Sequence, residues 1–184
     1  MMTTLDGFPV PVGLGGPENG VIVVLLCDAE RAPAAYDPLC ERLHTAALRT
    51  VVIGHDPRLT PKAVVGILDG LGIVWAVVVG DRAGAEIAWE LAATRLGRFV
   101  GLVAIDRGHP RVPDLNGVVR DAECPAVEVG TTVLTSSSAA GAVADDSQRF
   151  VYAHYRVVEL PERRNAQEST AQLAAEIVLR TSSW

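Results

Sequence analysis

The chain has 184 residues, of which 49% are hydrophobic and 21% charged, with a formal net charge of −6. This length and apolar content predict one packed domain over residues 1–184 and exclude a disordered chain. The acidic balance disfavours nucleic-acid binding, and the longest apolar run is too short to span a membrane. The N-terminus lacks the charged-then-apolar order of a signal peptide, so we expect a soluble, cytoplasmic protein.

The cysteines and histidines do not have the spacing of a metal site or a disulfide framework. Cys27, Cys40 and Cys124 are widely spaced and odd in number, which predicts buried free thiols. No two of the 4 histidines lie four residues apart, and none is part of an H-E-x-x-H motif. The sequence therefore predicts no metal and no cofactor.

Four short apolar runs alternate with helical patterns in the first part of the chain. The runs are typical of strands buried on both faces of a sheet and lie at 21–26, 51–53, 74–79 and 99–105. Apolar residues recur at helical spacing in the intervals between the runs. Thr60-Pro61 predicts the start of the second helix, since Thr caps a helix and Pro fits its first turn, and Gly72 predicts its end.

The remaining segments extend this pattern at both ends. Residues 4–12 predict a small antiparallel hairpin at the sheet edge, and 107–123, rich in Gly, Pro, Asp and Arg, predict a surface connection. Further strands are expected at 132–135 and 156–160, and further helices at 139–149 and 167–180. The whole order predicts an α/β fold with a mostly parallel, doubly wound sheet, helices on both faces and right-handed crossovers.

The stretch Gly80-Asp81-Arg82-Ala83-Gly84 joins the third predicted strand to the next helix. A sharp turn between two glycines at such a place is the setting of a nucleophile elbow, G-x-S-x-G. Here the central residue is Arg82, whose guanidinium stays protonated and cannot attack a carbonyl. The pattern therefore predicts the frame of a hydrolytic site without its nucleophile.

The order of these segments resembles the α/β-hydrolase superfamily over nearly the whole chain. Residues 4–16 are similar to the family's opening hairpin, 68–73 to the helix and turn before the elbow, and 92–106 to the stretch after it. Residues 157–161 resemble the strand that precedes the catalytic histidine. The resemblance implies an α/β-hydrolase-like fold with an N-terminal antiparallel hairpin.

The resemblance also implies where a catalytic triad and oxyanion motif would lie. Arg82 stands at the nucleophile position, Asn165 at about the position of the base, and Ser136-Ser137-Ser138 where a carboxylate is expected. Cys27-Asp28 stands in place of the His-Gly oxyanion motif. A triad needs a nucleophile, a base and an orienting carboxylate, so the alignment predicts a degenerate triad.

A cap domain is also expected to be absent. Only residues 107–123 separate Asp106 from Cys124, which leaves too little chain for a lid. Without a lid, little would exclude water from a reaction at this edge of the sheet.

Arg82 and Asp81 each admit more than one interpretation. A cation at a helix N-terminus is unfavourable, so Arg82 is expected to pair with Asp81 or with Glu86 at i+4, or else to bind a small anion. Asp81 could act as a nucleophile, as in some members of the superfamily. Its place one residue before the centre of the elbow favours a helix-capping role instead.

Several other polar residues follow predicted strand ends, where ligands bind to open parallel sheets. Asp28, His55, Asp106 and His109 have this position, and Asp106 with His109 could form an acid–base pair. Loop residues that make turn and cap hydrogen bonds are the favoured alternative. Cys27 could be a nucleophile only if a base such as His55 lowered its pKa.

Three functional hypotheses follow. The favoured one is a catalytically degenerate α/β-hydrolase homologue that acts as a binding or protein-interaction module, through a protein partner or a homodimer. The second is a weak or atypical hydrolase of a small ester, with Asp81, Asp106 and His109 as the residues to test. The third is a sensor of a small anion built on Arg82.

Overall fold

A computed structural model of the chain describes residues 1–160 and 166–182. Two short strands, β1 (Met2–Thr3) and β2 (Pro9–Val10), form an antiparallel pair of their own. The main sheet has seven strands in the order β3-β5-β4-β6-β7-β8-β9. They span Val12–Gly15 (β3), Ile22–Leu26 (β4), Arg49–Ile53 (β5), Ala76–Asp81 (β6), Phe99–Ile105 (β7), Thr131–Thr135 (β8) and Tyr155–Glu159 (β9).

The main sheet is parallel except at one edge, where β3 pairs antiparallel with β5. The central strands are continuous apolar runs because helices cover both of their faces. Every residue of β6 is buried, as is every residue of β8. The sequence-based prediction of a mostly parallel α/β sheet is thus confirmed.

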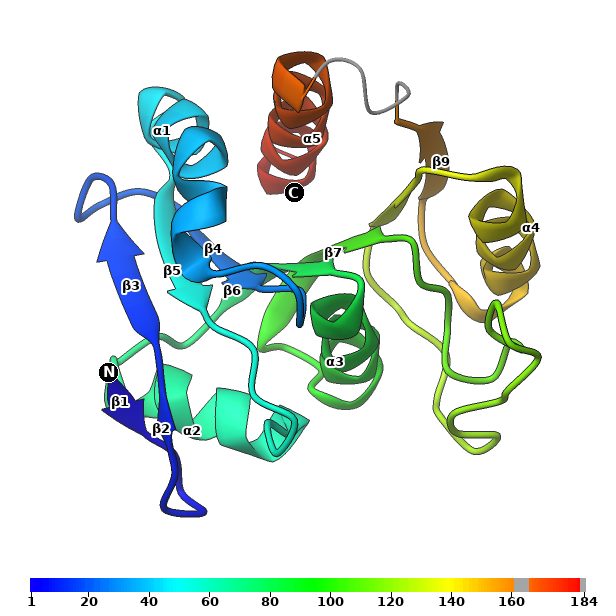
Figure 1. The fold of residues 1–184 in the computed structure, drawn as a ribbon, viewed down its shortest axis with the longest axis horizontal. Helices are drawn as coiled ribbons and strands as arrows, with labels where there is room; N and C mark the ends of the chain where they lie inside the picture. The colour runs from blue at the N-terminus through cyan, green and yellow to red at the C-terminus, as the bar shows by residue number, and fades with distance from the viewer. Residues whose placement is uncertain (161–165, 183–184) are drawn as a thin grey trace.

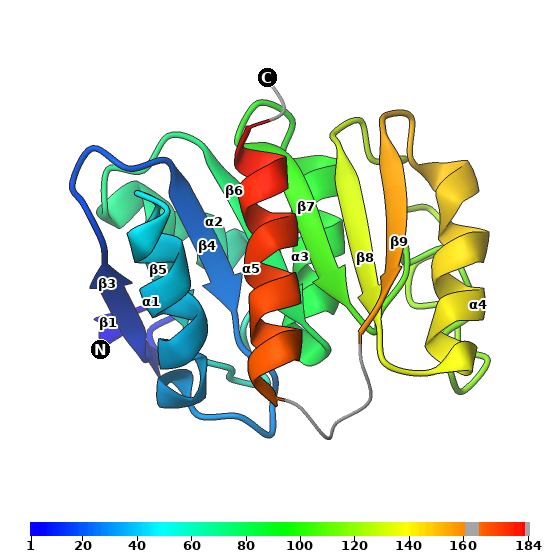
Figure 2. The same cartoon turned by 90° about the horizontal axis from the view of Figure 1, so that it is seen from above.

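Helices lie on both faces of the sheet (Figures 1 and 2). One face carries α1 (Asp37–Thr45) and α5 (Ala166–Thr181), which pack on Val23, Leu25 and Val79. The other face carries α2 (Pro61–Gly70), α3 (Ala83–Thr94) and α4 (Ser138–Ser147) over a second, larger apolar core. Figure 2 shows β4, β6, β7, β8 and β9 pointing in one direction between these two layers.

Side-chain caps fix the starts of two helices. The hydroxyl of Thr60 accepts a hydrogen bond from the N–H of Ala63 at 3.1 Å, so the predicted start of α2 is confirmed. The hydroxyl of Ser137 accepts one from Ala140 at 3.1 Å in the same way and begins α4.

Two expectations about the connections need correction. The N-terminal hairpin begins at Met2 and pairs only β1 with β2, while the following strand β3 joins the edge of the main sheet. Residues 106–130 contain no helix, in keeping with the expected lack of a cap domain. This connection is more than a surface loop, because the side chains of His109, Val112 and Cys124 are buried in it.

Within the described part of the chain, no helix combines the length and the apolar character needed to cross a bilayer.

Candidate functional site

The register of the parallel strands β4, β6 and β7 brings their carboxyl ends together. Leu26 of β4 lies opposite Gly80 of β6, and Asp81 of β6 lies opposite Ile105 of β7. The residues that follow these strands therefore meet at one edge. Asp28 and Asp106, two of the residues expected after strand ends, are brought to Arg82 in this way.

The turn between β6 and α3 has the strained geometry of a nucleophile elbow. Arg82 has φ 47° and ψ −103°, a conformation that L-residues rarely adopt. Gly80 and Gly84 make the turn possible. A Cβ on Gly84 would meet the carbonyl group of Leu26, and one on Gly80 would meet the backbone of Ala85. The chain thus has the backbone of such an elbow, with Arg82 at its centre.

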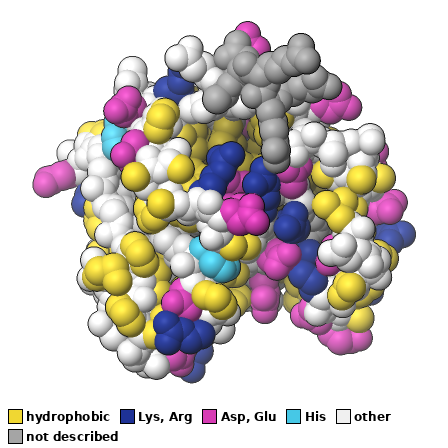
Figure 3. All heavy atoms as spheres, in the orientation of Figure 1, with side chains coloured by type: hydrophobic (Ala, Val, Ile, Leu, Met, Phe, Trp, Pro, Cys, Tyr) yellow, Lys and Arg dark blue, Asp and Glu magenta, His cyan; other side chains and the backbone are white. Residues whose placement is uncertain are grey.

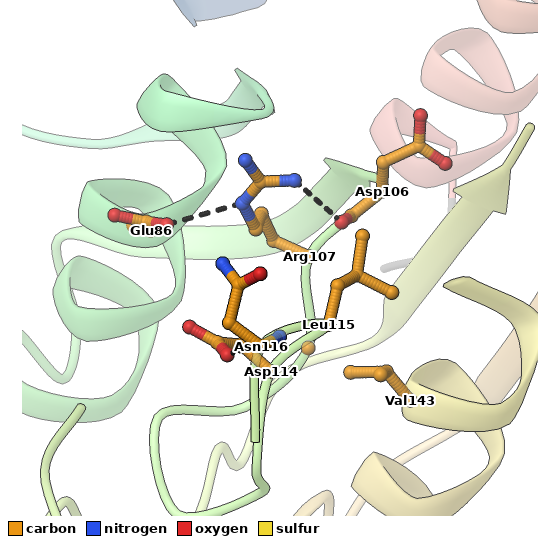
Figure 4. A pocket seen from close by; sticks show the side chains of 8 residues that line it. Glu86, Asp106, Arg107, Asp114, Leu115, Asn116 and Val143 are labelled. Atoms are coloured by element: carbon orange, nitrogen blue, oxygen red, sulfur yellow. Dashed lines mark hydrogen bonds and ion pairs between the residues drawn. The ribbon is translucent and has the colours of Figure 1, made fainter. Parts of the chain in front are cut away.

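Arg82 forms ion pairs with two carboxylates from other strands. Its Nη1 lies 3.3 Å from Oδ2 of Asp28, and its Nε lies 3.8 Å from Oδ2 of Asp106. The expected pairing with Glu86 is wrong, because Glu86 forms an ion pair with Arg107 at 3.1 Å (Figure 4). Arg82 precedes the helix with a non-helical backbone, so the i+4 spacing on which that prediction depended does not apply.

The carboxylate of Asp28 also accepts a hydrogen bond from the backbone N–H of Ala83, at 3.4 Å. Burial opposes ionisation of Asp28, but backbone N–H groups of Ala29 and Ala83 and the Arg82 guanidinium together hold its pKa below the usual value. In an α/β-hydrolase elbow, the N–H of the residue after the nucleophile stabilises the oxyanion. Here an internal carboxylate occupies that donor.

Asp81 is the last residue of β6 and does not cap α3, so the capping role expected from the sequence is wrong. Its Oδ2 accepts a hydrogen bond from the Tyr36 hydroxyl at 2.8 Å and lies 3.7 Å from Nη1 of Arg31. Only 4% of Asp81 is exposed, and burial raises its pKa above the usual value. Its side chain is thus held beside Tyr36 rather than at the centre of the elbow.

Asp106 and His109 do not form the acid–base pair considered from the sequence. Asp106 accepts hydrogen bonds from the backbone N–H of Ser136 at 2.7 Å and from the Ser136 hydroxyl. The Nε2 of His109 lies 2.7 Å from the carbonyl oxygen of Pro125, and its ring stacks on Phe150. Burial lowers the pKa of His109, in keeping with a neutral structural imidazole.

The other predicted site residues bring no catalytic group to the elbow. Cys27 is buried, and desolvation followed by the charge of Asp81 raises its pKa to about 12, which opposes a thiolate nucleophile. The Nδ1 of His55 is buried without a hydrogen-bond partner among the described residues. Asn165 lies outside the described residues.

A cavity of about 610 Å³ opens beside the elbow on the side of α1 and α5. Its polar wall contains the side chains of Arg31, Asp81, Arg82 and Asp106. Figure 3, in the orientation of Figure 1, shows dark blue and magenta side chains gathered near the centre of this face with hydrophobic groups around them. A smaller cavity of about 90 Å³ lies on the other side of Asp106 and is drawn in Figure 4.

Sequence reasoning missed Tyr36 and Arg31 as members of this site. Tyr36 ends a short 3₁₀ turn (Pro33–Tyr36) and both donates to Asp81 and accepts from the backbone N–H of Asp28 at 2.9 Å. The sequence contains no signal for this role, because the turn that carries Tyr36 becomes adjacent to β6 only when the strands assemble. Among the described residues, no group of three or more His, Cys, Asp or Glu side chains could hold a metal ion.

Comparisons with known proteins place this geometry within one fold. An α/β hydrolase from Sphaerobacter thermophilus is similar over 98% of this chain and 99% of its own, with a TM-score of 0.71 and 16% identity. The epoxide hydrolase VrEH1 from Vigna radiata gives a TM-score of 0.75 at 13% identity, covering 97% of this chain and 96% of that one. An epoxide hydrolase of the α/β-hydrolase superfamily from metagenomes of hot environments gives a TM-score of 0.78 at 11% identity, covering 99% of this chain and 97% of that one.

No family model and no curated protein matches the sequence. The similar solved structures show that the chain has the α/β-hydrolase fold, as its resemblance implied. Its strand order and its elbow geometry agree with that assignment. At identities below 20%, these structural matches establish the fold and leave the chemistry to be argued from the site itself.

Proposed function

We propose that this protein is a catalytically degenerate α/β-hydrolase homologue that acts as a binding module. One observation carries the proposal: the Asp28 carboxylate accepts a hydrogen bond from the N–H of Ala83 and forms an ion pair with the guanidinium of Arg82. The backbone donor that would stabilise a developing oxyanion, and the side chain at the centre of the elbow, are thus both paired with an internal carboxylate.

The histidines support the same conclusion. A serine-type mechanism needs an imidazole that can take a proton from the nucleophile. His44 is 2.8 Å from the hydroxyl of Thr50, His109 bonds to Pro125, and the Nδ1 of His154 lies 3.0 Å from Arg180. These three rings have structural partners away from the elbow, and the fourth histidine, His55, follows β5, which β4 separates from the elbow strand β6.

The two alternatives from the sequence have less support. An anion sensor needs an Arg82 with free positive charge, yet two carboxylates already neutralise it. A weak hydrolase that uses Asp81 needs this side chain at the centre of the elbow, yet it bonds to Tyr36. The cavity beside the elbow favours binding of a small molecule, and the protein partner or homodimer expected from the sequence stays a prediction.

The proposal is tested by intact-mass spectrometry after exposure to a fluorophosphonate ester, with an ester-hydrolysis panel alongside. An active serine hydrolase serves as the positive control under the same conditions. We expect no covalent adduct and no turnover above the uncatalysed rate. A stoichiometric adduct with turnover would overturn the non-catalytic function, and peptide mapping would then identify the labelled residue.

A further inference from the structure

The three carboxylates at the elbow differ in how well their charge is compensated. Asp28 accepts from the N–H of Ala83 and pairs with Arg82, and Asp106 accepts from both the N–H and the hydroxyl of Ser136. Asp81, in contrast, accepts one hydrogen bond within the described residues, from Tyr36. A buried carboxylate with a single donor lacks much of the stabilisation that water would give it.

The cation beside Asp81 does not supply that stabilisation. Arg31 lies 3.7 Å from the carboxylate and its side chain is 51% exposed, so solvent screens the pair. Burial raises the pKa of Asp81 above the usual value even though the charge of Arg82 acts to lower it. The ion pairs of Arg82 are with Asp28 and Asp106. Among the described residues, the charged lining and the Asp28 carboxylate behind it therefore contain three acidic groups against two basic ones.

The cavity beyond Asp81 suits a molecule with an apolar body. Leu39, Ile105 and Leu173 line it together with the acidic and basic groups, and its volume is about 610 Å³. Ligand sites commonly combine such apolar walls with a few polar groups that fix orientation. Asp81 and Asp106 both lie in the lining, with Ser136 beside Asp106.

We infer that this cavity holds a small amphipathic molecule with a cationic nitrogen that pairs with Asp81 and an alkyl body that packs on Leu39, Ile105 and Leu173. The inference rests on the proposed binding function and names the chemical class of its ligand. A primary ammonium supplies three N–H donors and one positive charge, which are what the Asp81 carboxylate lacks.

The same pairing makes binding depend on pH. Asp81 must be ionised to pair with the ammonium, and burial raises its pKa, so acidification is expected to weaken binding. The titratable and charged groups that act on Asp81 come from the segment after β4, from the 3₁₀ turn and from the elbow: Cys27, Asp28, Arg31, Tyr36 and Arg82.

The test is isothermal titration calorimetry of the full chain with n-hexylammonium, n-hexanoate and 1-hexanol, which share one alkyl body. We expect the Kd of hexylammonium to be about tenfold or more below those of the other two, since a charge-assisted hydrogen bond is worth at least this factor. In the wild-type protein, this Kd should rise as the pH falls, while that of hexanol stays constant.

The matched variants are Asp81→Asn and Asp69→Asn. Asp69 is a 61% exposed carboxylate on α2, outside the cavity lining, that pairs with Arg98. Asp81→Asn should weaken hexylammonium binding about tenfold or more and leave hexanol within about twofold, whereas Asp69→Asn should change neither. If Asp81→Asn does not fold, the pH dependence in the wild-type protein decides the question.

The possible results separate the two claims. Equal affinities for the three probes, or tighter binding of hexanoate, would overturn the cationic-ligand inference and leave the binding function standing. If none of the three probes binds, both the cationic-ligand inference and the proposed binding of a small molecule in this cavity are overturned. Labelling by the fluorophosphonate would instead overturn the non-catalytic function, whichever probe binds best.

Discussion

The carboxylate of Asp28 accepts a hydrogen bond from the backbone N–H of Ala83 across 55 positions of the sequence. The contact exists because β4 and β6 are neighbours in the sheet, so the residue after one strand reaches the first turn of the helix after the other. A helix N-terminus favours an anion, and Asp28 is an anion that the chain itself provides. The backbone N–H of Ala83 at the elbow is therefore occupied by a carboxylate of the same chain.

Replacement of Asp28 by Asn is expected to lower the free energy of unfolding at pH 7 by about 1–3 kcal/mol. The change removes a charged partner from Arg82 and weakens the hydrogen bond to Ala83. Urea denaturation followed by circular dichroism measures the difference. Asp69→Asn, which removes an exposed carboxylate, should cost less than about 1 kcal/mol and serves as the control.

The loss of stability caused by Asp28→Asn should also depend on pH and should become smaller as the pH falls. The pKa of Asp28 is lower in the folded protein than in the unfolded chain, so its contribution is complete above roughly pH 4 and is lost as the pH falls through the folded-state pKa. The two denaturation curves should therefore converge below about pH 4. A difference that grows on acidification would contradict the assigned ion pair.

Placing a serine at the elbow with Arg82→Ser is expected to produce neither esterase turnover nor a fluorophosphonate adduct. The hydroxyl would have no imidazole to take its proton, and Asp28 would still occupy the N–H of Ala83. Mass spectrometry and an ester panel on the folded variant make the measurement. An adduct at position 82 would mean that a base lies within reach of the elbow.

The elbow could be predicted from sequence because its determinants are local. A continuous apolar run before Gly80 and a second glycine at position 84 specify a strand, a sharp turn and a helix within nine residues of chain. The parallel sheet followed from the same kind of signal, an alternation of short apolar runs with helical spacing.

The partners of Arg82 could not be predicted because they depend on strand order. The hydrophobic pattern shows that β4, β6 and β7 exist but does not show that β6 lies between the other two. The nearest acidic residues in the sequence, Asp81 and Glu86, were therefore expected as partners. Asp81 instead points to Tyr36, and Glu86 pairs with Arg107.

Backbone strain at Arg82 predicts an unusual order of stability for two small substitutions. Arg82→Ala and Arg82→Gly both remove the ion pairs with Asp28 and Asp106. At φ 47° and ψ −103° only glycine avoids a steric penalty, so the Gly variant should be more stable by about 1–2 kcal/mol. Denaturant midpoints of the two variants, compared at equal m-value, test this order.

A matched substitution inside α3 gives the reference. Ala88→Gly, at a buried helical position, should lower stability by about 1 kcal/mol or more, because glycine is the poorer residue in a regular helix. If Arg82→Gly were instead less stable than Arg82→Ala, the strained turn would not be the conformation of position 82 in solution.

Two of the helix glycines, Gly84 in α3 and Gly141 in α4, should respond to alanine in opposite directions. A Cβ on Gly84 would meet the carbonyl group of Leu26, with the carbonyl carbon at 2.6 Å, because α3 begins against the end of β4. Relief of that clash would have to move α3 away from the sheet, so Gly84→Ala should cost at least about 3 kcal/mol of folding stability.

In α4, a Cβ on Gly141 has no atom of the described structure within 4 Å outside its own helix backbone and chain neighbours. Gly141→Ala should therefore raise stability by about 0.5–1 kcal/mol, since alanine has the higher helix propensity. Thermal unfolding of both variants beside the wild-type protein measures the contrast, and a Gly84→Ala protein as stable as the wild type would mean that the first turn of α3 does not pack on β4 as closely as the elbow requires.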